Sequence, residues 1–252
     1  MASRIELDGV RTWYDERGAG EPLVLLHGGF ADAAAFDRMA PELERTFRLY
    51  LPERRGHGHT PDVGGPITFD LMTEDTIAFI ERVIGGPVHL AGHSDGAILT
   101  LLVALRRPDL VRRMVPISGQ FHHEATADLA FSLEQMEAWM GDRYGELSPN
   151  GREHFPVFGA KVLRMWREEP TLTVAEVAEV AVPTLVMAAD DDGVAIEHTI
   201  AMYRAIPGAE LAIVPGTSHA LIDEKPELIN RLIFDFLTRD PVPTIMPVLR
   251  AR

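Results

Sequence analysis

The chain has 252 residues, a length that suffices for one large domain and does not exclude two small ones. Of these residues 46% are hydrophobic and 25% charged, a composition typical of a globular protein. Its formal net charge of −14 would repel nucleic acids and anionic membranes, so we expect neither as a partner. The lack of cysteine excludes disulfides and thiolate chemistry. Residues 1–9 carry no signal-like apolar segment and no apolar run is long enough to span a bilayer, so we expect a cytoplasmic protein.

Apolar strands alternate with helical patterns along the first 120 residues. Asp8-Gly9 predicts a tight turn between two short strands. The pattern then predicts, in chain order, a strand at 22–26, an amphipathic helix at 33–44, a strand at 47–51, a loop at 53–65, a helix at 69–84, a strand at 88–91, a helix at 97–105 and a strand at 114–117.

The alternation breaks between residues 121 and 180, where helical patterns at 128–141 and 152–167 occur without a convincing strand. It resumes with a strand at 183–188, a helix at 195–206, a strand at 210–214 and a helix at 226–237. We therefore expect a core formed by residues 1–120 and 181–252, with residues 121–180 inserted as a helical lid. Pro241, Pro243 and Pro247 predict an extended surface segment from Asp240 onward.

The strands of this pattern are continuously apolar, which is typical of a parallel sheet covered by helices on both faces. The expected fold is therefore a doubly wound α/β fold. In an open parallel sheet the carboxyl ends of the strands line one crevice, so residues far apart in the sequence can meet there.

Residues 92–96, Gly-His-Ser-Asp-Gly, lie between a predicted strand and a predicted helix. In a G-x-S-x-G turn the chain passes so sharply from strand to helix that only glycine fits beside the serine, which is left exposed at the helix N-terminus. The five residues alone are a weak signal, and serine before a helix is more often a plain N-cap. The position between strand and helix favours Ser94 as a nucleophile.

Two later strands end in residues that a serine nucleophile needs. The strand at 183–188 leads to three aspartates at 190–192, and the strand at 210–214 leads to Gly-Thr-Ser-His at 216–219. A serine hydroxyl needs a base to take its proton, and an imidazole base needs a carboxylate to orient it. The alternatives are a solvated loop for the aspartates and a surface position for His219.

Four motifs, in order, make the chain similar to the α/β-hydrolase family over roughly residues 5–238. They are His-Gly-Gly at 27–29, Arg-Gly-His-Gly at 55–58, the turn at 92–96 and Gly-Thr-Ser-His at 216–219. The sequence departs from the family at Glu53, where relatives usually have Asp, and at Ala189, where they usually have Gly. Neither departure removes a catalytic group.

The resemblance implies a catalytic triad in the chain order Ser, Asp, His. Ser94 would be the nucleophile and His219 its base. Family spacing points to Asp192 as the acid, with Asp190 and Asp191 as alternatives.

The resemblance also implies an oxyanion hole. Its donors would be the backbone N–H of Asp95 and that of Gly29, with Phe30 as the second choice. The side chain of Asp95 either caps the helix start or binds a cationic group of the substrate. Because it carries Asp after the nucleophile, the turn is similar to that of valacyclovir hydrolase and related amino-acid-ester hydrolases, which hold an α-amino group with this residue.

Apolar side chains of the expected lid either line an acyl pocket or pack on the core. They are Phe131, Met136, Trp139, Met140, Phe155, Phe158, Met165 and Trp166. Together with Asp95, we expect Phe30 and Trp139 to contact the substrate. The histidine pairs at 57 and 59 and at 122 and 123 lack a third ligand at a recognisable spacing, and no nucleotide-binding fingerprint is present, so neither a metal nor a cofactor is expected.

These features predict a serine hydrolase that cleaves small carboxylic esters, with amino-acid esters as one option, through an acyl-enzyme. Its partner would be a small-molecule substrate. The same triad would also serve C–C bond hydrolysis, lactone opening or perhydrolysis. A ligand-binding protein of this fold without turnover is the third alternative, and the intact triad pattern makes it less favourable. The oligomeric state stays open.

Overall fold

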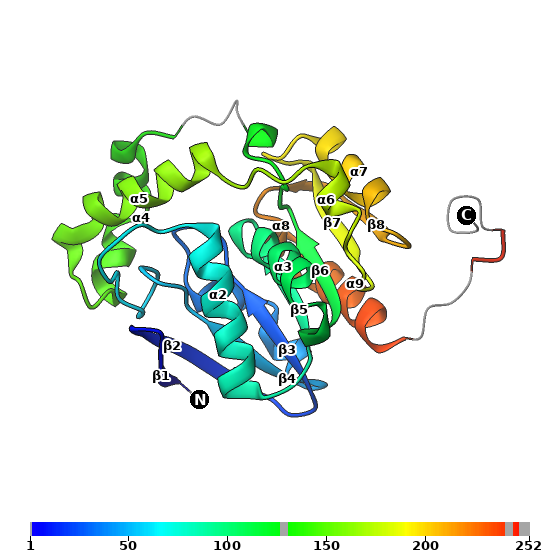
Figure 1. The fold of residues 1–252 in the computed structure, drawn as a ribbon, viewed down its shortest axis with the longest axis horizontal. Helices are drawn as coiled ribbons and strands as arrows, with labels where there is room; N and C mark the ends of the chain where they lie inside the picture. The colour runs from blue at the N-terminus through cyan, green and yellow to red at the C-terminus, as the bar shows by residue number, and fades with distance from the viewer. Residues whose placement is uncertain (1, 127–130, 240–243, 247–252) are drawn as a thin grey trace.

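The computed structural model describes residues 2–126, 131–239 and 244–246 (Figure 1). Its centre is an eight-stranded sheet in the order β1-β2-β4-β3-β5-β6-β7-β8. The strands are β1 (Ser3–Leu7), β2 (Val10–Arg17), β3 (Glu21–Leu26), β4 (Phe47–Pro52), β5 (Val88–His93), β6 (Val111–Ile117), β7 (Leu185–Asp191) and β8 (Glu210–Ser218). Pairings from β4 through β8 are all parallel, and only β1 and β2 run antiparallel to their neighbours. The predicted doubly wound, mostly parallel α/β fold is confirmed.

The turn between β1 and β2 forms where the sequence predicts it. Leu7 pairs directly with Val10, which leaves Asp8 and Gly9 as a two-residue turn. Their φ angles are 48° and 86°. An Asp-Gly pair tolerates this left-handed backbone and matches the twist of the two strands.

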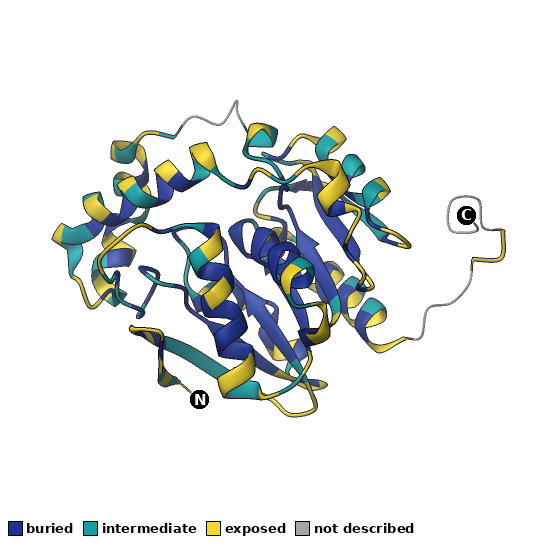
Figure 2. Cartoon of the chain, in the orientation of Figure 1, coloured by how far each residue is buried: buried dark blue, intermediate teal, exposed yellow. Residues whose placement is uncertain are grey.

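Helices cover both faces of the sheet, and a separate apolar core lies on each face. One core involves α2 (Phe69–Phe79), α3 (Asp95–Arg106) and α7 (Ile196–Ala205). The other involves α1 (Ala40–Leu43), α8 (Leu221–Glu224) and α9 (Pro226–Thr238). Figure 2 shows the central strands and α3 as buried, which explains why the sequence of this helix is apolar on all sides.

The prediction of one continuous helix at 33–44 is wrong. The structure has a 3-10 turn at Ala33–Phe36 and the single helical turn α1 instead. Pro41 lacks an N–H and its ring would clash with the carbonyl four residues earlier in a continuous helix, so the helix is interrupted. The predicted helix at 69–84 is also modified, because α2 continues as a π-helical turn at Ile80–Ile84 that ends on left-handed Gly85.

Between β6 and β7 the chain forms α4 (Leu133–Leu147), α5 (Phe155–Glu168) and the short α6 (Val174–Val177). We call α4 and α5 the helical insert; Figure 1 shows them packed against each other. The predicted helix at 128–141 starts later, because Ser132 and Gln135 form a capping box, and residues 128–130 lie outside the described part of the chain. The predicted tail falls mainly on residues 240–243 and 247–252, which are likewise outside the description.

Ion pairs, one of them on the buried Asp62, attach the helical insert to loops of the core. The Asp62 carboxylate, only 2% exposed, receives two hydrogen bonds from Lys161 of α5, at 2.8 and 2.7 Å. Asp32, beside the His-Gly-Gly loop, is bound by Arg143 of α4 at 3.0 and 3.1 Å. These pairs hold the insert over the loops that follow β3 and β4.

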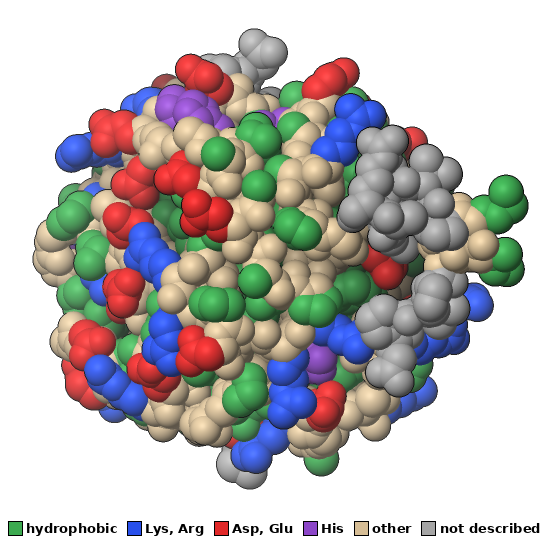
Figure 3. Space-filling view, turned by 45° about the vertical axis from the view of Figure 1, so that its right-hand side comes forward, with side chains coloured by type: hydrophobic (Ala, Val, Ile, Leu, Met, Phe, Trp, Pro, Cys, Tyr) green, Lys and Arg blue, Asp and Glu red, His purple; other side chains and the backbone are tan. Residues whose placement is uncertain are grey.

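The surface carries charges of both signs. On the face that Figure 3 shows, acidic and basic side chains are interspersed with hydrophobic ones. Exposed ion pairs of this kind contribute about 0–1 kcal/mol each, so they do not fix the geometry of a site. Within the described ranges, none of the helices combines the length and the apolar character that a membrane crossing requires.

Candidate active site

Ser94 lies at the sharp turn between β5 and α3. Its φ of 56° and ψ of −119° are strained for a residue with a side chain. The glycines two residues on either side are required sterically: a Cβ on Gly92 would lie 2.1 Å from the Gly96 carbonyl oxygen, and a Cβ on Gly96 would lie 1.9 Å from that of Leu26. The turn therefore has the geometry of a nucleophile elbow, with the Ser94 hydroxyl at the carboxyl end of the sheet.

The structure brings Ser94, His219 and Asp192 into one hydrogen-bonded chain. The Ser94 hydroxyl oxygen lies 3.0 Å from His219 Nε2. His219 Nδ1 lies 2.7 Å from Asp192 Oδ1. In such a chain the imidazole can take the hydroxyl proton while the carboxylate holds the ring and favours its protonated form.

Asp192 is the one of the three neighbouring aspartates that reaches His219. Its second oxygen accepts hydrogen bonds from the Ser118 hydroxyl and from the Ala189 N–H. Burial alone would raise the pKa of Asp192, but the hydrogen bonds from His219 and Ser118 outweigh burial and hold this pKa at about 2. The carboxylate therefore stays ionised beside the imidazole.

The other two aspartates are placed differently. Asp190 accepts hydrogen bonds from the backbone N–H groups of Gly216 and Thr217 at 2.8 and 3.0 Å, so it ties the end of β7 to the end of β8, directly before His219. Asp191 is exposed. Neither lies in the hydrogen-bonded chain that ends on the serine.

Free backbone donors lie beside Ser94. Within the described residues, the N–H groups of Gly29, Phe30 and Asp95 find no hydrogen-bond acceptor. Gly28 approaches the nucleophile closely, because a Cβ on it would lie 3.3 Å from Ser94 Cβ. Unpaired N–H groups at a helix N-terminus and in an adjoining loop are suited to stabilise a developing oxyanion.

Comparison with known proteins agrees with this geometry. Residues 23–232 match the Alpha/beta hydrolase family, which is most of the chain. The chain belongs to this family. It is therefore an enzyme of the α/β-hydrolase fold.

The chain is similar to hydrolases named for different substrates. It is 26% identical over 262 residues to (E)-2-((N-methylformamido)methylene)succinate hydrolase of Acinetobacter baylyi, covering 96% of this chain and 100% of that protein. It is 25% identical to the putative carbamate hydrolase RutD of Agrobacterium fabrum, covering 87% of this chain and 94% of that protein. A solved meta-cleavage product hydrolase from Pseudomonas fluorescens shares the fold, with a TM-score of 0.79, 21% identity and coverage of 93% and 97%.

The Asp95 side chain of this hydrolase is buried against the helical insert. It is 3% exposed, and its Oδ1 accepts the indole N–H of Trp166 at 2.9 Å. Its Oδ2 is buried and has no hydrogen-bond partner among the residues described. Burial raises the pKa of Asp95, and the nearby Arg54 and Trp166 oppose this effect. The side chain therefore does not point out to solvent as a simple helix cap would.

Aromatic rings form a layer above the His-Gly-Gly loop. Phe30 packs against Phe155, Phe158 and Trp166, with ring centroids 5.4 to 5.8 Å apart. Trp139, which we expected at the substrate, is 60% exposed, and its ring contact among the described residues is with Phe131, which in turn contacts Trp166. Trp166 is the tryptophan that touches the site.

Some polar contacts at the site have no signal in the sequence. Ser118 binds Asp192, and His93 Nε2 lies 2.7 Å from the backbone carbonyl of His219, which fixes the loop of the base. Burial, together with the nearby His219, lowers the pKa of His93 to about 4, so the ring is a neutral donor. His93 belongs to the elbow motif, but its partner is 126 residues away and only the fold reveals the contact.

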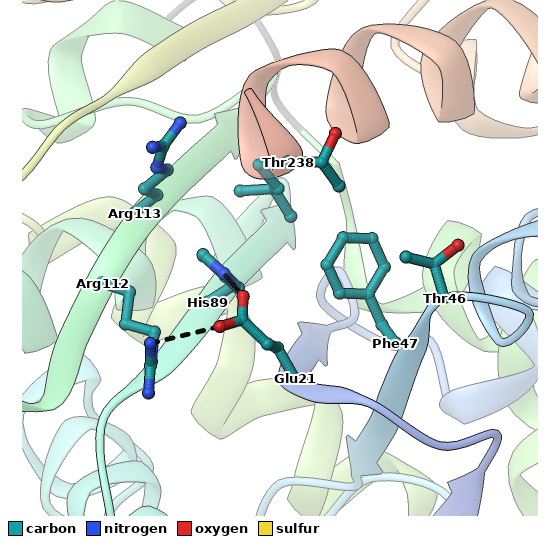
Figure 4. A pocket seen from close by; sticks show the side chains of 8 residues that line it. Glu21, Thr46, Phe47, His89, Arg112, Arg113 and Thr238 are labelled. Atoms are coloured by element: carbon teal, nitrogen blue, oxygen red, sulfur yellow. Dashed lines mark hydrogen bonds and ion pairs between the residues drawn. The ribbon is translucent and has the colours of Figure 1, made fainter. Parts of the chain in front are cut away.

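A separate cavity of about 370 Å³ lies near the amino-terminal ends of the central strands, away from the carboxyl ends where Ser94 lies (Figure 4). Its polar lining is largely paired internally, since Glu21 binds both His89, at 3.1 Å, and Arg112, at 3.3 Å. It includes none of the residues around Ser94. We therefore do not assign it to the active site.

Proposed function

We propose that this enzyme is a serine hydrolase that cleaves small carboxylic esters through an acyl-enzyme. The observation that carries the proposal is the continuous hydrogen-bonded chain from Ser94 through His219 to Asp192. A strained serine on a tight turn, a neighbouring imidazole and free N–H donors are the parts that acyl transfer needs.

The proposed reaction has two halves. Ser94 Oγ attacks the ester carbonyl while His219 takes its proton, and the N–H groups of Asp95 and Gly29 stabilise the oxyanion. His219 then protonates the departing alcohol, which leaves an acyl group on Ser94. Water activated by His219 cleaves this acyl group and restores the serine. Asp192 stays ionised and orients the imidazole throughout. The proposed reaction uses only groups of the chain and one water molecule.

The helical insert supplies the substrate cover in this proposal. Residues 121–180 act as a lid whose Trp166 and aromatic neighbours face Phe30 and Asp95. Excluding water from the acyl-enzyme site strengthens the hydrogen bonds to the oxyanion. Phe30, rather than the more exposed Trp139, forms the wall of the acyl site.

The side chain of Asp95 narrows the substrate class to esters with a hydrogen-bond donor near the scissile carbonyl, an amino group being the best fit. This argument rests on Asp95 Oδ2, a buried carboxylate oxygen without a partner among the described residues. A buried polar atom that stays unpaired costs about 1–3 kcal/mol, more if it is charged, so a donor on the substrate would relieve this cost. We expect an amino-acid ester to react faster than the matching ester without an amino group.

Relatives suggest a second use of the same residues. Their names include hydrolases of amidomethylene succinates, a meta-cleavage product hydrolase and an enol-lactonase. The Ser94, His219 and Asp192 chain would serve these substrates as well, because fold and triad do not decide the bond that is cleaved. Measuring esters, lactones and enamides side by side will separate the two candidates.

The test of the proposed function is substitution of the nucleophile. Ser94→Ala should abolish both labelling by a fluorophosphonate probe and turnover of p-nitrophenyl acetate, while thermal unfolding stays cooperative. Full turnover by this variant would exclude Ser94 as the nucleophile.

For the substrate class, Asp95→Asn should reduce the preference for amino-acid esters over plain esters by about tenfold or more, which corresponds to about 1.4 kcal/mol. If both ester types react alike in the parent and the variant, the amino-group proposal fails.

A further inference from the structure

Arg54 is a buried cation directly behind the His-Gly-Gly loop. It is 4% exposed, and no carboxylate lies within ion-pair distance of it in the described part of the chain. Burying a charge without a paired opposite charge is costly, so its position calls for a role. Desolvation lowers the pKa of Arg54 to about 10, and Asp95 is the anion that opposes this effect. At neutral pH the guanidinium is still charged.

The guanidinium of Arg54 binds two consecutive carbonyl groups of the loop. Its Nη1 donates to the His27 carbonyl, and its Nη2 donates to the Gly28 carbonyl at 2.7 Å. The Gly28 carbonyl also accepts a hydrogen bond from His27 Nδ1, at 2.8 Å. His27 Nε2 accepts the Arg54 backbone N–H at 3.4 Å, which fits a neutral ring with its proton on Nδ1. The orientation of the Gly28 carbonyl is thus fixed from two sides.

The Gly28 carbonyl and the Gly29 N–H belong to the same peptide unit. This unit is trans, since the cis bond recorded in the described residues is Glu169-Pro170. In a trans peptide the two groups point in opposite directions. Holding the carbonyl toward Arg54 therefore turns the Gly29 N–H away from Arg54, where no acceptor in the described residues takes it. A guanidinium on the carbonyl also polarises the peptide and makes its N–H a stronger donor.

Charge supports the same role. Asp95 follows the nucleophile, and an ionised carboxylate there opposes the negative charge that develops on the substrate oxygen. Asp95 Oδ2 would lie 2.6 Å from a Cβ on Gly29, so the carboxylate and the guanidinium flank the same short loop. The positive charge of Arg54 offsets the negative charge of the Asp95 carboxylate at the point where the oxyanion forms.

We propose that Arg54 is a positioning residue for the reaction: by binding the His27 and Gly28 carbonyls it aims and polarises the Gly29 N–H, and its charge counterbalances Asp95. Arg54 does not touch the substrate in this proposal. It rests on the proposed acyl transfer at Ser94. The expected signature is a loss in kcat rather than in KM, since the interaction strengthens as the oxyanion forms.

The experiment compares Arg54→Lys and Arg54→Met with Arg55→Met in hydrolysis of p-nitrophenyl acetate, each normalised by fluorophosphonate titration of active sites. Lysine keeps the charge but cannot bind both carbonyls in a planar fork, so we expect kcat to fall about tenfold in Arg54→Lys. In Arg54→Met it should fall by about 100-fold, the lower end of the loss that follows removal of one oxyanion donor. KM should change less than threefold in both. Arg55, in the same loop, instead pairs with Asp75 at 2.7 and 2.8 Å, so Arg55→Met should lose stability but keep kcat per active site within about threefold.

The charge component is tested by combining Arg54→Met with Asp95→Asn. If the two charges offset each other, the double variant should recover at least about threefold in kcat over Arg54→Met alone. Normal kcat per active site in both Arg54 variants would overturn the proposal, as would a fall in kcat of equal size in Arg55→Met. An unmodified enzyme that does not turn over the ester would instead overturn the proposed ester hydrolysis.

Discussion

Trp166 of the helical insert donates its indole N–H to Asp95, the residue that follows the nucleophile, at 2.9 Å. One hydrogen bond thus joins the insert to the first residue of α3. Whatever moves α5 relative to the core also changes the environment of the Asp95 carboxylate. Under the proposed function, this contact joins the substrate cover to the carboxylate that would bind the amino group of the substrate.

Replacing Trp166 tests that link. Trp166→Phe keeps an aromatic ring but removes the donor to Asp95 Oδ1, which leaves both Asp95 carboxylate oxygens without a hydrogen-bond partner among the described residues. A hydrogen bond to a charged group contributes about 1.5–3 kcal/mol, so we expect kcat/KM for p-nitrophenyl acetate to fall about tenfold or more. Trp139→Phe is the matched control, because Trp139 is 60% exposed and does not reach Asp95. Equal losses in the two variants would argue against a specific role of Trp166.

Gly29 lies where a side chain has no room. A Cβ there would come within 2.5 Å of the Trp166 ring and 2.6 Å of Asp95 Oδ2. Gly29→Ala should therefore displace the loop or the insert and reduce kcat/KM about 100-fold, comparable to the loss of an oxyanion donor. Gly64→Ala serves as the control, since a Cβ on Gly64 meets nothing within 4 Å. Parent-like kinetics in Gly29→Ala would show that this loop does not form the oxyanion hole.

Much of this arrangement follows from local sequence, and the rest depends on contacts that only folding creates. The predicted strands and the Gly-x-Ser-x-Gly turn show that Ser94 and His219 each follow a strand. Because the carboxyl ends of parallel strands line one crevice, the two residues are predicted to lie together. From the sequence we expected Trp139 at the substrate, but Trp166 is the tryptophan that contacts Asp95. Helical periodicity alone does not show which aromatic side chains of a helix face the core. Arg54 carries no motif signal of its own, because its partners lie 26 and 27 residues earlier in the chain.

Acid should destabilise the fold partly through His57. This side chain is 1% exposed, and burial together with the charge of Arg54 lowers its pKa to about 3. In the unfolded chain the pKa of a histidine is about 6.5, so below that pH the unfolded state binds a proton that the folded state does not. The free energy of unfolding should therefore fall by about 1.4 kcal/mol per pH unit for this group as the pH drops from about 6 to 4.

Urea unfolding of the parent and of His57→Gln across this range measures the effect. The variant should show a shallower pH dependence by about that amount, whatever its stability at neutral pH. Identical slopes would mean that His57 does not remain neutral in the folded protein.

The central claim is that Ser94 carries the acyl group during turnover. Intact-protein mass spectrometry after rapid acid quench of a reaction with p-nitrophenyl acetate, followed by peptide mapping, measures this directly. We predict one acetyl group per active chain on the peptide that contains Ser94, formed at the rate of the p-nitrophenol burst and missing in Ser94→Ala. Full steady-state turnover without any acyl group on Ser94, or with the label on another residue, would contradict the mechanism.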